Sequence, residues 1–196
     1  MDTLAHSVPH EAAARRRAFT ADDLERMTRQ GIIADSERVE LIGGDIVAMA
    51  AKGNFHEIVR NALTFSWARK VPDGFLVYGE TPLRLSERDN PEPDIIVFPA
   101  ALALPDVRGD TVLLVVETAD TSLGYDLGIK SGLYAHFGVR EYWVIDAPQL
   151  VTHVHRAPVD GQFTSVIKHA AADLVTPLDV PLLASRLADF GFDWAA

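Results

Sequence analysis

The chain has 196 residues, of which 48% are apolar and 23% are charged, and its formal net charge is -10 at pH 7. This composition supports a packed core and excludes a disordered chain, and the lack of an apolar run of roughly 18 residues excludes a membrane-spanning helix. The sequence has no cysteine, so disulfides and thiolate-bound zinc are excluded and a cytoplasmic location is expected. The acidic charge argues against non-specific wrapping of DNA, which requires a basic surface.

The length fits one compact domain. We expect residues 1–18 to be a flexible tail without a signal-peptide core, and residues 19–196 to form a single domain. The three successive arginines at positions 15–17 are interpreted as a solvated part of this tail, with an arm that binds nucleic acid as the alternative.

The first predicted elements are a short helix and a hairpin. Thr20 is placed to cap a helix that ends near Gly31. Two short strands around Gly43 and Gly44 are then typical of a β-hairpin. The next helix, over residues 55–70, is indicated by apolar residues at helical spacing and ends at a Pro-Asp-Gly turn.

The rest of the chain predicts a mixed sheet. One helix is expected from about Ser122 to Phe137, and a last short helix over residues 181–192. Strands are predicted over residues 75–85, 93–99, 111–118, 141–146, 150–156 and 162–168, the last two as a hairpin. The fold class is therefore α/β, at the border with α+β. It has a mixed central sheet flanked by helices, with the N-terminal hairpin and the C-terminal hairpin as additions.

Two carboxylates are the first candidates for a functional site. Asp94 lies at the start of its predicted strand, and Glu117 lies at the end of the next one. If these strands are antiparallel neighbours, the two side chains approach within reach of one metal ion. Mg²⁺ prefers oxygen ligands, and the carbonyl of Thr118 is a further candidate. The alternative is that both acids only mark where buried strands reach solvent.

Lys130 interrupts an apolar helix face. Leu127, Lys130, Tyr134 and Phe137 follow helical spacing, so the lysine is expected to face the sheet with its neighbours. A lysine in that position is costly unless it is paired with acids. Two alternatives stay open: its stem extends to solvent, or it forms a weak surface ion pair with Asp126.

Other candidates are weaker when taken one at a time. His153 and His155 alternate on a predicted strand and are interpreted as an exposed hairpin face. A stripe of glycines on the helix after Ser122 suggests close approach of another backbone, with a poorly formed helix start as the alternative. These glycines are Gly124, Gly128 and Gly132.

Several ordered motifs together resemble a known family. They are RVELIGGDIV, a histidine early in the following helix, PEPDIIV, and VVET-D-SL-YD-G-K---Y---GV-EYWVID, between about Phe19 and Asp146. This pattern is similar to that of the Uma-two family, described as putative restriction endonucleases of the PD-(D/E)XK nuclease superfamily. The resemblance implies a restriction-endonuclease-like core and a phosphodiester hydrolase dependent on Mg²⁺ or Mn²⁺, with DNA as the expected substrate.

The resemblance also implies roles for single residues. Asp94 and Glu117 match the two metal-binding acids of the catalytic site. The superfamily lysine, expected two residues after the second acid, is replaced here by Ala119, and Lys130 matches the family's lysine displaced onto the next helix.

Two more catalytic candidates follow from the same resemblance. Glu40 matches an additional acid, and His56 matches a histidine of the first core helix. A solvated hairpin acid and a hydrogen-bonded core histidine are their alternatives. Glu80 stands where relatives often have glutamine, which adds a negative charge near the expected site.

Three functions are compatible with the sequence. The first is a metal-dependent endonuclease acting on DNA, for which a homodimer is one expected assembly. The second is a catalytically weak nuclease-fold module for binding or assembly, which the acidic charge favours. The third is a metal hydrolase of small phosphoesters. No membrane partner is expected.

Overall fold

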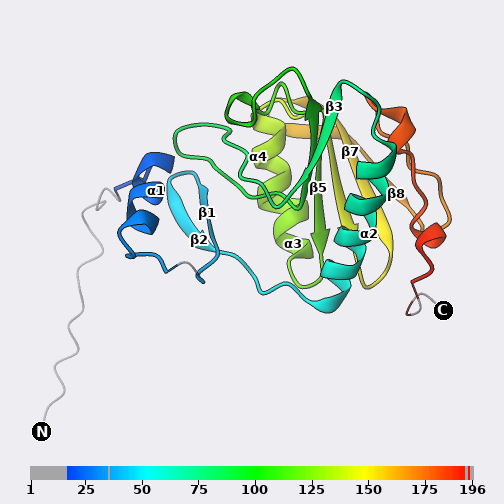
Figure 1. Ribbon diagram of the computed structural model, residues 1–196, viewed down its shortest axis with the longest axis horizontal. Coiled ribbons are helices and arrows are strands. Elements are labelled where there is room, and N and C mark those ends of the chain that lie inside the picture. The colour runs from blue at the N-terminus through cyan, green and yellow to red at the C-terminus, as the bar shows by residue number, and fades with distance from the viewer. Residues whose placement is uncertain (1–16, 35, 193, 195–196) are drawn as a thin grey trace, which may run out of the picture.

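A computed structural model describes residues 17–34, 36–192 and 194 (Figure 1). The predicted tail over residues 1–18 therefore lies almost entirely outside the described residues. At its end, the Phe19 N–H donates to the Gly44 carbonyl at 2.8 Å, so the chain is tied to the first hairpin from this point. In the described part of the chain, no helix is long and apolar enough to cross a bilayer. The expectation of a single domain over 19–196 stays a prediction.

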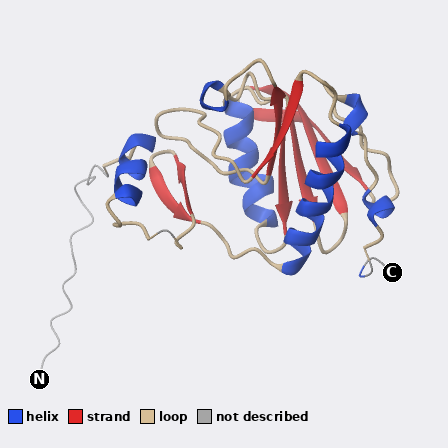
Figure 2. Ribbon diagram, viewed as in Figure 1, coloured by secondary structure: helices blue, strands red, loops and turns tan. Residues whose placement is uncertain are grey.

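A six-stranded mixed sheet forms the centre of the fold (Figures 1 and 2). Its order is β3-β4-β5-β6-β7-β8, and all neighbours are antiparallel except the parallel pair β5 and β6. The strands are β3 (Phe75–Gly79), β4 (Ile95–Pro99), β5 (Leu114–Ala119), β6 (Glu141–Asp146), β7 (Val151–Val159) and β8 (Gln162–His169). The predicted α/β class, the mixed sheet and the C-terminal hairpin β7–β8 are thus confirmed.

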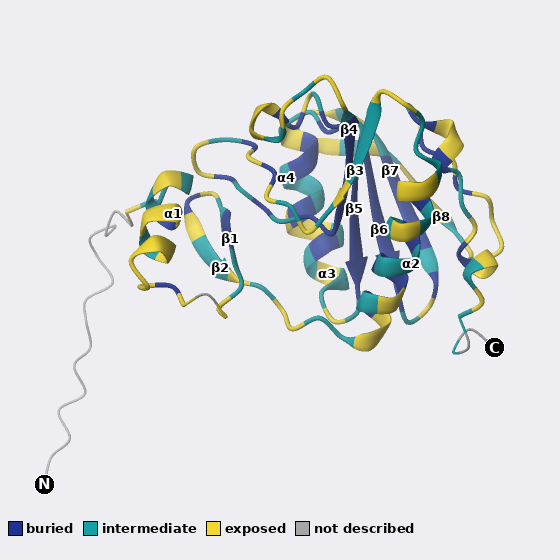
Figure 3. Cartoon of the chain, in the orientation of Figure 1, coloured by how far each residue is buried: buried dark blue, intermediate teal, exposed yellow. Residues whose placement is uncertain are grey.

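Helices cover both faces of this sheet. α2 (Asn54–Lys70) packs Val59, Leu63 and Trp67 against one face. The connection from β5 to β6 covers the other face and runs through α3 (Leu123–Tyr125), a π-helical segment (Asp126–Lys130) and α4 (Ser131–His136). Because both faces are covered, β5 is buried along its whole length (Figure 3).

The helix predicted from Ser122 to Phe137 has the expected extent but an unexpected interior. Residues 126–130 form a π-helix, whose hydrogen bonds span one residue more than those of an α-helix. Gly124, Gly128 and Gly132 are not approached by another backbone, because a Cβ atom built on any of them meets nothing within 4 Å. The expectation that another helix of the described chain approaches this stripe is wrong, and a contact with another subunit stays a prediction.

The N-terminal elements form a small unit beside the central sheet. α1 (Ala21–Arg29) packs on the two-stranded sheet of β1 (Val39–Ile42) and β2 (Asp45–Ala48), at the left of Figure 1. The predicted hairpin is confirmed, and its turn uses glycines at φ +60° and +83°. An isolated bridge from Leu41 to Asn90 joins this hairpin to the segment before β4.

The N-cap of α1 gives a stability prediction. The Thr20 hydroxyl accepts from the Asp23 N–H at 3.1 Å, and the Asp23 carboxylate accepts from the Thr20 N–H at 3.1 Å. We expect Thr20→Ala to lower the free energy of unfolding by about 1 kcal/mol, measured by urea denaturation. Thr28→Ala, on the exposed side of the same helix, is the matched control. An equal loss in both variants would contradict a capping role.

The predicted C-terminal helix is wrong. Residues 181–192 contain two 3₁₀ turns, Pro181–Leu183 and Leu187–Phe190, in place of one helix. Leu183 and Leu187 are buried in the core on the α2 side of the sheet, and Gly191 adopts a left-handed φ of +66°. Irregular backbone lets this segment follow the core surface, which a straight helix would not do.

The interpretation of His153 and His155 as an exposed face is also wrong. Both are buried, because α4 packs across β7 and β8 on that side of the sheet. The ring of His155 lies against Tyr142 and Phe163, with centroid distances of 5.5 and 5.6 Å. Alternation along a strand shows which residues share a face, but it does not show whether a helix covers that face.

His155 gives a pH prediction. Burial lowers the pKa of His155 to about 4, below its ordinary value of 6.5. The unfolded chain therefore binds this proton first as pH falls, and the folded protein loses stability between pH 6.5 and 4. Between pH 7 and pH 4.5, the free energy of unfolding measured with urea should fall by about 2 kcal/mol less in His155→Gln than in the native chain. His136→Gln, at an exposed position, should lose as much stability between the two pH values as the native chain does. Equal losses in all three proteins would contradict the assignment to His155.

Candidate active site

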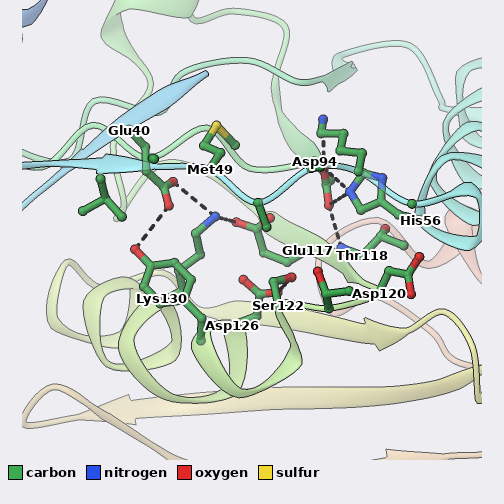
Figure 4. Close-up of a pocket in the computed structure, with 18 residues that line it drawn as sticks. Glu40, Met49, His56, Asp94, Glu117, Thr118, Asp120, Ser122, Asp126 and Lys130 are labelled. Carbon is green, nitrogen blue, oxygen red and sulfur yellow. Dashed lines mark hydrogen bonds and ion pairs between the residues drawn. The ribbon is translucent and has the colours of Figure 1, made fainter. Parts of the chain in front are cut away.

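A cavity of about 300 Å³ lies where the first hairpin, the start of α2 and the end of β5 meet (Figure 4). The π-helical segment closes another side of it. All five residues predicted for the catalytic site line this cavity, although they come from five different elements or their flanks. They are Glu40, His56, Asp94, Glu117 and Lys130.

Asp94 and Glu117 are brought together by the antiparallel register of β4 and β5. Ile95 pairs with Val116, so Asp94, one residue earlier, falls opposite Glu117, one residue later. Each residue is only 4% exposed. The antiparallel arrangement on which the predicted acid pair depends is confirmed, and the reading of these acids as points where strands meet solvent is wrong.

Asp94 is held by donors from two directions. Nε2 of His56 lies 2.9 Å from both carboxylate oxygens, and the Thr118 N–H donates to Oδ2 at 2.7 Å. Burial alone would raise the pKa of Asp94, but hydrogen bonding to His56, its charge and the Thr118 N–H outweigh burial and lower it. His56 is therefore a buried, hydrogen-bonded histidine that orients the Asp94 carboxylate, and its catalytic role stays a prediction.

Lys130 reaches the same cavity from the helical connection. Its Nζ lies 2.9 Å from Oε1 of Glu117 and 3.2 Å from Oε2 of Glu40 (Figure 4). The residue is 4% exposed, so extension to solvent and a surface pair with Asp126 are both wrong. Burial disfavours its charge, yet the carboxylates around it outweigh burial and raise its pKa.

Glu117 has a carboxyl group in an unusual environment. Burial raises the pKa of Glu117 to about 8, and the nearby acids Asp94 and Asp126 add to the effect, whereas Lys130 opposes it. The Tyr134 hydroxyl donates to Oε1 at 2.9 Å and fixes the side chain. A carboxyl group with such a raised pKa in a cavity is typical of functional sites.

Glu40 is part of this cluster and not a solvated hairpin acid. It is 3% exposed. The Tyr125 hydroxyl donates to its Oε1 at 3.2 Å, and the Glu92 N–H donates to Oε2 at 3.4 Å. Glu40 thereby holds Lys130 from the side opposite Glu117.

Sequence reasoning missed three charged residues of the cavity, Lys52, Asp120 and Asp126. Asp126 is buried and accepts from the Ser122 hydroxyl at 2.6 Å, and burial raises its pKa. Lys52, in the loop before α2, lies 3.5 Å from Oδ1 of Asp94 and contacts Glu80. The position of Asp126 four residues before Lys130 was a usable signal, but a loop lysine carries no periodicity that would reveal it.

The acid pair suits a hard cation in part. In the described chain, no three His, Asp or Glu side chains are arranged to hold a metal ion. Mg²⁺ sites in phosphoryl-transfer enzymes commonly use one or two carboxylates, with waters and substrate phosphates completing the shell. Asp94 and Glu117 provide such a pair. The share predicted for the Thr118 carbonyl stays a prediction.

The fold and the cluster define an α/β protein with two buried acids and a lysine at one end of a mixed sheet. A family model for Uma2, described as "Putative restriction endonuclease", matches residues 21–188. The chain therefore belongs to the Uma2 family, as its motifs predicted.

A solved structure shares this fold. The chain is similar to the crystal structure of a "putative nuclease belonging to DUF820" from Anabaena variabilis ATCC 29413, with a TM-score of 0.71 and 15% sequence identity. The match covers 91% of this chain and 99% of the other. Among curated proteins, none matches the chain.

Proposed function

We propose that this protein is a divalent-metal-dependent nuclease with a restriction-endonuclease-like core that hydrolyses phosphodiester bonds of DNA. One observation carries the proposal: Lys130 is buried 2.9 Å from Glu117, which lies beside Asp94 at the end of the sheet. A lysine and two acids buried together around a cavity are costly to a fold without a use for them. Membership in Uma2 supports the same reaction class.

Each residue of the site has a distinct role in the proposed reaction. Asp94 and Glu117 would hold Mg²⁺ or Mn²⁺, which lowers the pKa of bound water and polarises the scissile phosphate. Lys130 places an ammonium where negative charge develops on the phosphate in the transition state. Glu40 and Tyr125 act as positioning residues behind it, and His56 keeps Asp94 ionised and oriented.

Cleavage assays test this proposal directly. We expect the native chain to cut plasmid DNA with Mn²⁺ or Mg²⁺, and Asp94→Asn to lower the rate by about 100-fold or more because a metal-binding oxygen and its charge are lost. Asp73→Asn, in the exposed turn after α2, removes the same charge elsewhere and should leave the rate unchanged. Equal rates in all three proteins would remove Asp94 from the reaction.

A hydrolase of small phosphoesters is the second candidate. The cavity holds about 300 Å³ and five carboxylates line it, which suits a small ligand better than a duplex unless cations compensate. Activity on a mononucleotide ester that exceeds activity on plasmid DNA would favour this candidate. Metal binding without any cleavage would favour the binding or assembly module. The homodimer expected for double-strand cleavage is part of the nuclease proposal, and light scattering after gel filtration tests it.

A further inference from the structure

Lys52 is a charged residue of the cavity that none of the family motifs includes. It lies in the loop between β2 and α2, and its side chain is 13% exposed. Its Nζ forms an ion pair with Glu80 and lies 3.5 Å from Oδ1 of Asp94. The ammonium is therefore held between a carboxylate proposed to bind metal and the carboxylate of Glu80, whose side chain is 37% exposed.

The charge balance of the cavity indicates a role for Lys52. Five carboxylates line the cavity, whereas its lysines are Lys52 and Lys130. Both lysines are paired with two acids, but the Lys130 side chain is 5% exposed and that of Lys52 is 13% exposed. Lys52 is the more accessible of the two. The Lys52 ammonium can donate hydrogen bonds to the oxygens of a phosphodiester that approaches this acidic cavity.

Glu80 is built to hold Lys52 in place. It adopts a left-handed backbone with φ +48°, which is uncommon for a residue with a side chain. The Glu80 N–H donates to the Asp94 carbonyl at 3.1 Å, which fixes the two residues relative to each other. Arg60 and Arg38 lie 3.3 and 3.7 Å from the Glu80 carboxylate and restrain it further.

The loop that carries Lys52 is also docked tightly. A Cβ atom on Gly53 would lie 1.8 Å from Oδ2 of Asp120, so this position requires glycine while Asp120 keeps its place. Asp120 directly follows β5, the strand that carries Glu117. The backbone beside Lys52 thus lies close to the residue that follows β5.

We infer that Lys52 binds a non-bridging oxygen of the substrate phosphate, and that Glu80 is the positioning residue that keeps Lys52 at the mouth of the site. The inference rests on the proposed nuclease function. In the free protein, Lys52 balances the charge of Asp94. If Asp94 held a divalent cation, its charge would be balanced without Lys52, and the ammonium paired with Glu80 would be available to a phosphate oxygen.

Opposite effects of Lys52→Gln on the Kd for metal and on the KM for DNA test this role. We compare the native chain with Lys52→Gln, with Lys52→Arg, and with the control Lys168→Gln, which removes the same charge from an exposed position on β8. Calorimetry with Mn²⁺ alone should show a Kd about 10-fold lower for Lys52→Gln, because a positive charge beside Asp94 is gone. Cleavage of a DNA duplex should show KM about 10-fold higher, because a charged phosphate contact is lost.

The remaining arms separate this role from a structural one. Lys52→Arg should recover native KM within about threefold, since the charge is kept, and Lys168→Gln should match the native chain in both measurements. Unchanged Kd and KM in Lys52→Gln, or a loss of metal binding and thermal stability together, would overturn the inference while native cleavage still supports the nuclease. A native chain that neither binds Mn²⁺ nor cleaves DNA would overturn the proposed function and this inference with it.

Discussion

Lys130→Met is expected to lower the rate of DNA cleavage by about 1,000-fold, because the proposed mechanism uses this buried ammonium to stabilise charge on the reacting phosphate. The methionine stem fills a similar volume, so the helical connection should keep its path. The rate is measured with plasmid DNA at saturating Mn²⁺, and the fold is checked by circular dichroism. Lys168→Met, at an exposed position on β8, is the matched control.

The same substitution should weaken the fold, because the buried Glu40 carboxylate would lose its cation and Glu117 would lose a hydrogen-bond donor. We expect a loss of about 3 kcal/mol in the free energy of unfolding. Adding Glu40→Gln should restore most of this stability but none of the activity. If the double variant recovered cleavage, Lys130 would act only by balancing the charge of the two acids and would have no direct role in the reaction.

The positions of the main site residues could be predicted because they follow from simple geometry. Asp94 and Glu117 meet through the register of two adjacent antiparallel strands, which their places at a strand start and a strand end indicate. Lys130 was recognisable as a costly residue on an apolar helix face. The resemblance to Uma2 then added Glu40 and His56, whose surroundings depend on contacts between distant segments.

The rest of the site depends on features that local patterns do not contain. The π-helical turn from Asp126 to Lys130 brings both side chains to the cavity. Helical spacing predicted the inward position of Lys130, but it placed Asp126 only as the partner of a possible surface pair. Lys52 arrives from a loop in which Gly53 lies close to the Asp120 carboxylate, a proximity between segments distant in sequence. The burial of His155 likewise depends on where α4 packs, which no pattern within its own strand records.

Glu117→Gln is expected to make the metal-free protein more stable and the metal-bound protein less so. The pKa of Glu117, about 8 in the folded protein, lies above its ordinary value of 4.5. Between these values the folded state keeps a proton that the unfolded chain has released, so ionising this carboxyl costs stability as pH rises toward 8. Glutamine avoids that cost and still accepts from Tyr134 and Lys130.

Thermal unfolding at pH 8 shows both effects in one experiment. With a chelator present, Glu117→Gln should unfold about 3 °C above the native chain, a gain of about 1 kcal/mol. With Mn²⁺, the native Tm should rise with metal concentration, whereas the variant should show little rise because a carboxylate ligand is missing. Glu87→Gln, at an exposed position, should follow the native chain throughout. A metal-dependent rise of equal size in native chain and variant would exclude Glu117 as a ligand, and a lower Tm without metal would mean that the buried charge stabilises the fold. If Glu117→Gln instead has the higher Tm with chelator and the lower Tm with Mn²⁺, the native protein keeps a destabilising carboxyl group because the bound cation requires it.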